Sequence, residues 1–253
     1  MREVLFQIGG LRIFSYGFFV AVGILVATIW LVQQVKKEGK SPDFVIDVVL
    51  IGVIAGIIGA RLFYIFLYQP EYLANPVQIL YIWKGGLAFY GGLLLGFICI
   101  LIYLFRAQIP ILPFLDLAAP ATALGYGIAR FGCFMNGCCY GKVTTVPWGV
   151  VFPVIDGATR HPTQLYSMLS SLLIFIILLW IKGRGARFRG QLFSLALILY
   201  GLFRSVIELF RENTQLSGGP MEASMAALVI AAFGGIIYVF LFIRSKRKGA
   251  LGL

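Results

Sequence analysis

The sequence predicts an all-α, polytopic membrane protein with about seven transmembrane helices. Of its 253 residues, 60% are hydrophobic and only 12% are charged, which is about half the charged fraction of an average soluble domain. Seven apolar segments have lengths near the roughly 20 residues that a helix needs to cross a bilayer. They lie at about 14–34, 44–68, 86–105, 114–131, 163–182, 189–210 and 224–243. We expect residues 1–253 to form a single integral membrane domain, with no cleavable signal peptide.

The positions of the basic residues predict the orientation of these segments. Twelve would lie on one side of the membrane: Lys36, Lys37, Lys40, Arg106, Lys182, Arg184, Arg187, Arg189, Arg244, Lys246, Arg247 and Lys248. Six would lie on the other side: Arg2, Arg12, Lys84, Lys142, Arg160 and Arg211. Because cytoplasmic loops carry an excess of Lys and Arg, we expect the N-terminus outside and the C-terminus in the cytoplasm. The net charge of +11 then reflects topology and attraction to anionic lipid, and no nucleic-acid binding is expected.

The second segment combines a packing motif with a charged residue. Gly52 and Gly56 form a G-x-x-x-G motif, which lets two membrane helices approach closely. Arg61 follows inside the same apolar run and needs an anionic partner there. A structural carboxylate and a substrate are both open as that partner.

Two tyrosines lie near expected membrane boundaries. Tyr16 follows Leu5–Arg12, which we expect to be a short amphipathic segment leading into the first span. Composition favours an interfacial aromatic residue at Tyr16 over a substrate contact. Tyr90 lies in GGLAFYGG (85–92), where two glycine pairs allow a backbone or a ligand to approach closely. A hydrogen bond to a neighbouring helix and a functional role both remain open for Tyr90.

The chain is expected to be organised around the stretch 125–142, GYGIARFGCFMNGCCYGK. Arg130 lies at or just inside a membrane boundary, where an arginine costs about 2.5–3.5 kcal/mol on insertion scales. It is therefore a candidate site residue with an anionic partner, the alternative being an arginine that snorkels from a helix end. A turn rich in Gly, Cys and Asn follows, and it begins a small extracytoplasmic cap expected at about 132–162.

Polar residues recur along one face of segment 189–210. Tyr200, Arg204 and Glu208 are spaced at i, i+4 and i+8, with Arg211 near the same face. A lipid-facing stripe of this kind would be too costly, so the face is expected to point into the protein or a water-filled cavity. His161, the only histidine, precedes a proline, which favours a structural role over catalysis.

Five motifs together resemble the prolipoprotein diacylglyceryl transferase family. In chain order they are FSYG (14–17), GGLAFYGG (85–92), ARFGCFMNGCCYG (129–141), HPTQLY (161–166) and YGLFRSVIELFR (200–211). The resemblance covers nearly the whole chain. It implies a seven-helix enzyme of the bacterial plasma (inner) membrane, with its active site toward the extracytoplasmic side.

The resemblance also implies a reaction. Family members move the diacylglyceryl group of phosphatidylglycerol to the lipobox cysteine thiol in the signal peptide of a preprolipoprotein. The products are a thioether-linked lipid and glycerol phosphate, and this is the first step of bacterial lipoprotein maturation. The partners implied are phosphatidylglycerol, preprolipoprotein signal peptides and the lipid bilayer, with no cofactor and no metal.

Matched residue by residue, the resemblance implies the following site. The catalytic residues are Arg130, Arg204, Tyr90 and Glu208, and the substrate-binding residues are Arg130, Asn136, Gly141, Tyr16, Tyr200, Arg211 and His161. Arg130 is expected to contact the phosphatidylglycerol head group. A phosphate leaving group develops negative charge, which the planar fork of arginine can bind through two hydrogen bonds.

The sequence departs from the family pattern at three positions. Some relatives carry a histidine where Tyr90 stands, and a phenol, with an ordinary pKa near 10, is a poor general base. Two alternatives are therefore open. Either Tyr90 donates a hydrogen bond, or the substrate thiol loses its proton to Glu208, His161, water or the phosphate. Cys133 and Cys138 replace an asparagine and an acid of the common signature. A disulfide between them is sterically plausible, although sequence alone does not fix the connectivity.

Two other functions would also use some of these residues. A membrane thiol oxidoreductase would use the cysteines at 133, 138 and 139 on the oxidising side of the membrane, but the chain has no C-x-x-C pair. A transporter of an anionic solute would also place arginines in helices, but no half-to-half repeat is visible. The sequence also contains no P-loop and no common metal-ligand motif.

Overall fold

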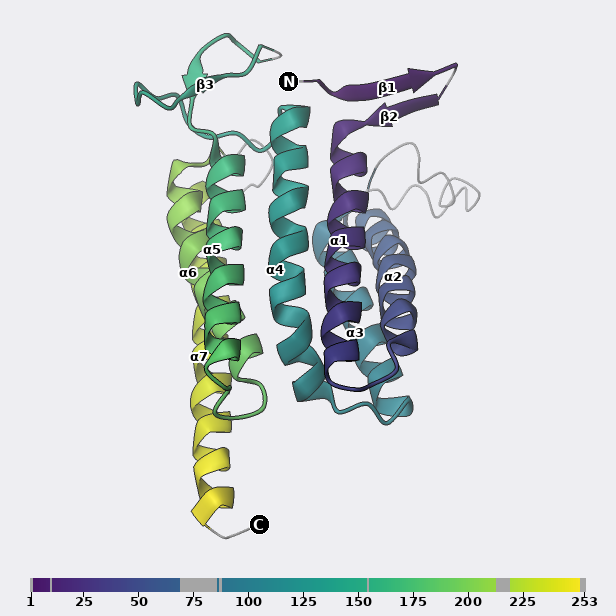
Figure 1. Ribbon diagram of the computed structural model, residues 1–253. Helices are drawn as coiled ribbons and strands as arrows, with labels where there is room; N and C mark the ends of the chain where they lie inside the picture. Colours follow the sequence, from purple (N-terminus) through teal and green to yellow (C-terminus); the bar gives the residue numbers. More distant parts are fainter. Residues whose placement is uncertain are drawn as a thin grey trace. The chain divides into compact units, whose positions relative to one another are not determined.

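A computed structural model describes residues 2–9, 11–68, 86, 88–153, 155–212 and 219–250 (Figure 1). The helices are α1 (Ser15–Lys37), α2 (Asp43–Tyr68), α3 (Phe89–Arg106), α4 (Ile111–Asn136), α5 (Thr163–Gly183), α6 (Gln191–Phe210) and α7 (Gly219–Ala250). The strands are β1 (Val4–Ile8), β2 (Leu11–Phe14), β3 (Val150–Val151) and β4 (Thr159–Arg160). The seven helices coincide with the seven predicted segments to within a few residues at most of their ends.

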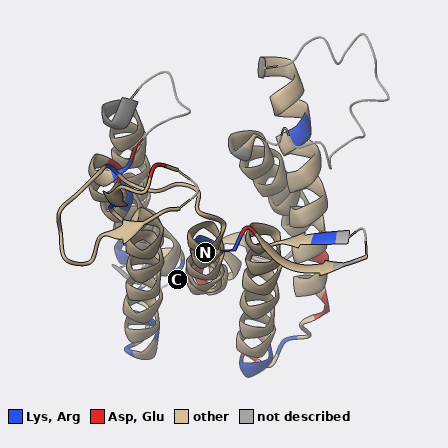
Figure 2. Cartoon of the chain, turned by 90° about the horizontal axis from the view of Figure 1, so that it is seen from above, with Lys and Arg blue, Asp and Glu red and all other residues tan. Residues whose placement is uncertain are grey.

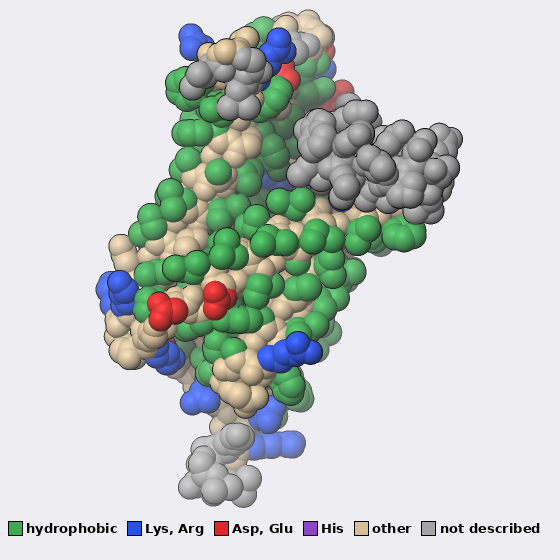
Figure 3. Space-filling model, turned by 90° about the vertical axis from the view of Figure 1, so that its right-hand side faces the viewer, with side chains coloured by type: hydrophobic (Ala, Val, Ile, Leu, Met, Phe, Trp, Pro, Cys, Tyr) green, Lys and Arg blue, Asp and Glu red, His purple; other side chains and the backbone are tan. Residues whose placement is uncertain are grey.

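The lengths and surfaces of the helices confirm a polytopic helical membrane protein. Within the described residues, all helices except α3 are long and apolar enough to cross a membrane, and the apolar part of α3, Tyr90–Arg106, is shorter. Large apolar side chains such as Ile54, Leu94 and Phe233 are more than half exposed. Hydrophobic side chains cover most of the helical surface seen in Figure 3, while charged residues occupy only short stretches of the chain in Figure 2. Such a surface suits contact with lipid.

The N-terminal segment forms a β-hairpin. Strands β1 and β2 pair antiparallel, with Gln7 opposite Arg12, so the region expected as a short amphipathic segment is extended. Gly9, with φ of 59°, supplies the left-handed residue at the turn. The backbone N–H of Ser15, the first residue of α1, donates to the carbonyl of Glu3 at 2.8 Å. The hairpin is thereby tied to the start of α1.

The chain packs as two compact units, Met1–Leu31 with Leu115–Leu253 (unit 1) and Val32–Phe114 (unit 2). In unit 2, α2 and α3 pack through glycines. A Cβ on Gly92 would lie 2.8 Å from the carbonyl oxygen of Gly56, and one on Gly96 would lie 3.2 Å from that of Gly52. The predicted G-x-x-x-G packing is therefore confirmed. Arg61 is buried within this unit and donates to the carbonyl of Gly86 at 3.2 Å.

Unit 1 holds the elements around Arg130. Ala119 of α4, Leu178 of α5 and Leu192 of α6 belong to one buried apolar cluster. Asp116, near the start of α4, accepts the backbone N–H groups of Gly190 at 2.5 Å and Phe193 at 2.9 Å. The carboxylate thus satisfies two N–H groups that the beginning of α6 would otherwise leave unpaired. This contact fixes α6 against α4, and with it the polar stripe of α6.

Candidate active site

Arg130 lies near the C-terminal end of α4, two turns before the helix ends. Its Cζ atom is 4.7 Å from the centre of the Tyr126 ring, one helical turn earlier. The Nε atom of Arg130 is buried and has no hydrogen-bond partner among the described residues. Because a buried donor without an acceptor is costly, this geometry favours an oxygen-bearing ligand at Arg130.

The predicted polar stripe of α6 converges on one fully buried carboxylate. Glu208 has no exposed surface, and its Oε2 lies 2.7 Å from Nη2 of Arg204 while its Oε1 lies 3.7 Å from Nη1 of Arg211. The structure thus pairs Glu208 with both arginines at this end of α6. These are ion pairs by distance, since neither carboxylate oxygen accepts an aligned hydrogen bond from the described residues. Because one carboxylate faces two guanidinium groups, the three side chains together keep a net positive charge.

A narrow pocket connects Arg130 with this stripe. It is lined by Arg130, Cys139, Thr163, Gln164, Ser167, Arg204, Ile207 and Arg211. A neighbouring pocket shares Ser167, Arg204 and Ile207 and is also lined by Tyr126 and Tyr200, whose rings meet edge to face with centroids 5.7 Å apart. Three guanidinium groups around one pocket, with one carboxylate between two of them, suit an anionic group.

The turn after α4 is held in place from α5. Gly137, directly after the last helical residue, has φ of 73°, and Cys139 has φ of 61°, so the chain enters the left-handed region twice. Thr163 Oγ1 donates to the carbonyl of Cys139 at 2.7 Å, and Gln164 Nε2 donates to that of Cys138 at 2.6 Å. The first turn of α5 therefore positions the backbone of the cysteine pair.

Gly141 joins the end of this turn to the end of α6. Its N–H donates to the carbonyl of His161 at 2.8 Å, and it forms an antiparallel bridge with Arg211. The N–H of Lys142 donates to the carbonyl of Phe210 at 2.9 Å. A Cβ on Gly141 would lie 2.7 Å from Cβ of His161, so a larger residue would push these strands apart. This close approach places Arg211 beside the turn at 137–141, which we call the signature turn.

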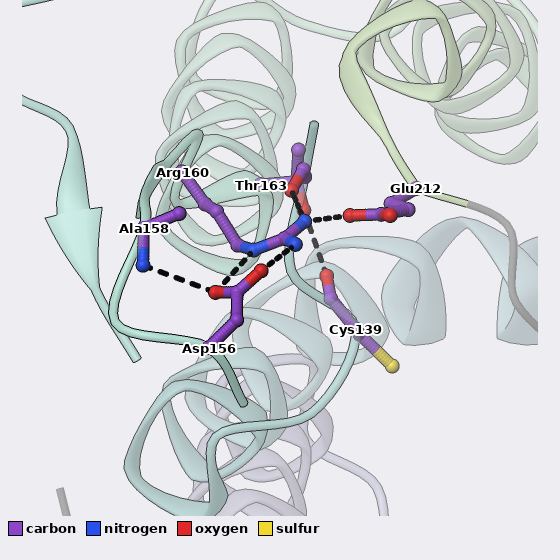
Figure 4. Close-up of polar contacts among 7 residues, drawn as sticks. Cys139, Asp156, Ala158, Arg160, Thr163 and Glu212 are labelled. Atoms are coloured by element: carbon purple, nitrogen blue, oxygen red, sulfur yellow. Dashed lines mark hydrogen bonds and ion pairs between the residues drawn. The ribbon is translucent and has the colours of Figure 1, made fainter. Parts of the chain in front are cut away.

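A second ion-pair cluster fastens the segment 143–160 to the same turn (Figure 4). Arg160 is buried and forms ion pairs with Asp156, at 2.5 Å, and with Glu212. Its Nη1 donates to the carbonyl of Gly141 at 3.4 Å, and its Cζ lies 5.0 Å from the centre of the Tyr140 ring. The hydrogen bond from Arg160 lowers the pKa of the Asp156 carboxyl below its ordinary value. Arg160 thus links the segment 143–160, the turn at 137–141 and the chain after α6.

His161 makes contacts typical of a structural residue. Its Nδ1 lies 3.0 Å from the hydroxyl of Tyr166, which also accepts the indole N–H of Trp148 at 2.8 Å. The imidazole ring packs against Phe210, with ring centroids 5.2 Å apart. A direct role of His161 toward substrate stays a prediction.

The structure brings most of the predicted site residues of unit 1 into one region. Arg130, Arg204, Glu208, Arg211 and Tyr200 contact or line the two adjacent pockets, and Gly141 supports Arg211. Asn136 is the last residue of α4. Tyr16 lies in the first turn of α1 with 49% of its surface exposed. Tyr90 lies at the start of α3 in unit 2 and is 63% exposed.

Sequence reasoning missed six polar residues that line the two pockets: Tyr126, Thr163, Gln164, Ser167, Ser170 and Ser171. Tyr126 carried a signal, because it stands four residues before Arg130 and so lies on the same helix face. Thr163 and Gln164 belong to the HPTQLY motif. Their hydrogen bonds to the carbonyls of Cys138 and Cys139 depend on the fold and carry no signal in the sequence.

The chain matches known proteins along nearly its whole length. The family model described as prolipoprotein diacylglyceryl transferase matches residues 3–242. A phosphatidylglycerol–prolipoprotein diacylglyceryl transferase of Clostridium tetani is 37% identical over 96% of this chain and 97% of its own length. One of Geobacter sulfurreducens is 39% identical over 87% of this chain and 86% of its own length. The chain therefore belongs to the prolipoprotein diacylglyceryl transferase family.

Proposed function

We infer that this chain is an enzyme that transfers the diacylglyceryl group of phosphatidylglycerol to prolipoproteins, the substrates in its relatives' names. The observation that carries this inference is the pocket bounded by Arg130, Arg204 and Arg211 at the family's signature turn. An anionic lipid head group supplies the charge that this pocket lacks. The acceptor that we propose is the lipobox cysteine in the signal peptide of a preprolipoprotein.

The proposed reaction is one displacement at a glycerol carbon. The acceptor sulfur forms a bond to the diacylglyceryl carbon, the bond from that carbon to the phosphate oxygen breaks, and glycerol phosphate leaves. The thiol proton passes to a base. Negative charge grows on the departing phosphate, and Arg130 and Arg204 would bind it in a site with little water, where such interactions are strong.

The remaining site residues are proposed to position these groups. Glu208 contacts Arg204 and Arg211, which supports a role in holding both guanidinium groups toward the pocket. The residues proposed to bind substrate alongside Arg130 are Asn136, Gly141, Tyr16, Tyr200, Arg211 and His161. Tyr90 is proposed to donate a hydrogen bond rather than to take the thiol proton.

The proposal includes a location and an orientation. The chain would be a multi-pass protein of the bacterial inner membrane, a single domain over residues 1–253, with the N-terminus outside. The cap at about 132–162 and the pocket would face the extracytoplasmic side. The apolar helices support the membrane location, and the excess of Lys and Arg in one set of loops supports the orientation.

A direct transfer assay tests this function. Purified protein is mixed with phosphatidylglycerol labelled in its acyl chains and a lipobox peptide, with a peptide carrying serine in place of the cysteine as control. Label should appear in the cysteine peptide only, together with free glycerol phosphate. A protein that oxidised thiols, or carried an anion across vesicles, without labelling the peptide would instead support one of the two alternative functions.

A further inference from the structure

Three cysteine side chains meet at the end of α4. The Sγ atoms of Cys133, Cys138 and Cys139 all lie within 4.8 Å of one another, and all three are free thiols. A metal with three sulfur ligands at about 2.3 Å places those sulfurs about 4 Å apart. The three thiols are therefore already close to the spacing that such a metal requires.

The backbone holds this arrangement in place before any ligand binds. Cys133 lies in the last turns of α4, and the N–H of Cys138 donates back to its carbonyl at 3.2 Å. Cys139 adopts φ of 61°, which costs a residue with a side chain about 1 kcal/mol or more. The hydrogen bonds from Thr163 and Gln164 fix the carbonyls of the cysteine pair. A strained residue held this firmly indicates that the positions of its atoms matter.

The cluster is buried on one side and partly open on the other. Cys133 is buried, whereas Cys138 and Cys139 are partly exposed and Cys139 lines the pocket with Arg130. The two partly exposed thiols give an ion access to the cluster.

We propose that Cys133, Cys138 and Cys139 form a three-sulfur binding site for the thiophilic cation Cu⁺. Thiolates are the ligands that Cu⁺ prefers, and within the described residues no His, Asp or Glu joins the three cysteines as a fourth ligand. Three thiolates and one Cu⁺ carry a charge of about −2, which the nearby Arg130 and Arg211 can offset. On binding, the protons still held by the thiols are released to solvent.

Copper titration of the reduced protein tests the site. Full-length protein in detergent is titrated with Cu⁺ without oxygen, in competition with a coloured Cu⁺ chelator, and the bound metal is examined by X-ray absorption. One equivalent should bind, with three sulfur neighbours at about 2.3 Å. Cys133→Ser, Cys138→Ser and Cys139→Ser should each weaken Cu⁺ binding at least tenfold, because each removes one of three ligands.

Cys99→Ser is the matched control, since Cys99 is a free cysteine of α3 in unit 2 and its loss should leave Cu⁺ binding unchanged. The thermal unfolding midpoint of each variant separates a lost ligand from a lost fold. The proposal is overturned if wild-type protein takes up no more Cu⁺ than a folded Cys133/Cys138/Cys139 triple serine variant. Two sulfur neighbours instead of three, or uptake that follows Cys99, would overturn it equally. Because binding is measured rather than transfer, the result does not depend on the proposed function.

Discussion

At the scale of single residues, Arg130 provides a geometry that lysine does not reproduce. Its planar group stacks on Tyr126 and presents paired N–H donors, whereas a lysine ammonium is a point charge. We expect Arg130→Lys to lower the rate of transfer by about 10²–10³-fold, the usual cost of losing an aimed donor to a developing anion. Arg130→Ala should abolish transfer. The labelled-lipid assay measures both.

Arg184→Lys is the control for this prediction. Arg184 also stacks on an aromatic ring, with its Cζ 3.7 Å from the centre of Trp180, but it stands just after the C-terminus of α5. Transfer should be unaffected by this change. An Arg130→Lys enzyme with most of its activity would show that Arg130 is an arginine that snorkels to the membrane boundary.

Glu208 gives a prediction about both stability and activity. Its carboxylate is fully buried between Arg204 and Arg211, so Glu208→Gln leaves two guanidinium groups without their anion. Breaking a buried ion pair from one side typically costs about 3–5 kcal/mol. We expect a lower thermal unfolding midpoint together with a loss of transfer, measured on the same preparation.

Glu38→Gln is the matched control for Glu208→Gln, because it makes the same chemical change in an exposed ion pair. Glu38 pairs with Lys40 at 2.8 Å, with 37% of the Glu38 side chain and 52% of the Lys40 side chain exposed. An exposed pair contributes only about 0–1 kcal/mol, so this variant should resemble the wild type in both measurements. Equal effects of the two substitutions would contradict the role assigned to the buried carboxylate.

Tyr90 tests whether a phenol can serve as a hydrogen-bond donor in this family. If Tyr90 donates a hydrogen bond, Tyr90→Phe should lower turnover without moving the pH optimum, because the group that accepts the thiol proton is unchanged. Tyr90→His should stay active, since the resemblance places a histidine there in some relatives. A shift of the pH profile by a unit or more in Tyr90→Phe would identify Tyr90 as the base.

At the scale of elements, two adjacent glycines of α7 allow the steric cost of a larger residue to be compared with its gain in helix propensity. A Cβ on Gly234 would lie 2.8 Å from Cβ of Leu197 and 3.0 Å from the backbone N of Ile198, both in α6, whereas one on Gly235 would meet nothing within 4 Å. Gly234→Ala should therefore destabilise the protein by about 1–3 kcal/mol. Gly235→Ala should stabilise it by up to about 1 kcal/mol, because alanine favours the helix. Thermal unfolding in detergent should show shifts of opposite sign, and shifts of the same sign would contradict the α6–α7 packing.

Elements with a strong periodic signal could be predicted from the sequence, and those set by local backbone geometry could not. The i, i+4, i+8 spacing of Tyr200, Arg204 and Glu208 fixes a shared helix face whatever the tertiary structure, so the stripe and its buried carboxylate were predictable. The β1–β2 hairpin was not, because its short strands show no clear alternation of polar and apolar residues.

The site was predictable for its charged residues and not for its supports. Arg130 stands out because an arginine within an apolar run is costly. The hydrogen bonds from Thr163 and Gln164 to the cysteine carbonyls join residues more than 20 positions apart. Their donors are ordinary polar residues, and the left-handed conformation of Cys139 that they support carries no compositional signal.

At the scale of the whole molecule, the membrane topology depends on whether α3 spans the bilayer. Its 18 residues span about 27 Å at 1.5 Å per residue, slightly less than the roughly 30 Å of a hydrocarbon core. With seven spans the two termini lie on opposite sides, and with six they lie on the same side. Local thinning of the bilayer accommodates a short helix at modest cost, and Arg106 at the end of α3 can snorkel to the boundary.

A reporter that is active only outside the cytoplasm tests this threading. Fused after Val143, which lies in the proposed cap, it should be active, whereas fused after Arg106 or Arg187 it should not be. The reason is that the loops at 106–113 and 182–188 hold Arg106, Lys182, Arg184 and Arg187, and such short basic loops are retained in the cytoplasm. If α3 does not span, every later fusion changes sides: activity appears after Arg106 and Arg187 and disappears after Val143. That pattern would place the arginine pocket, formed at the end of α4 that leads into Val143, on the cytoplasmic side. That location would contradict the proposed transfer to preprolipoproteins on the extracytoplasmic side.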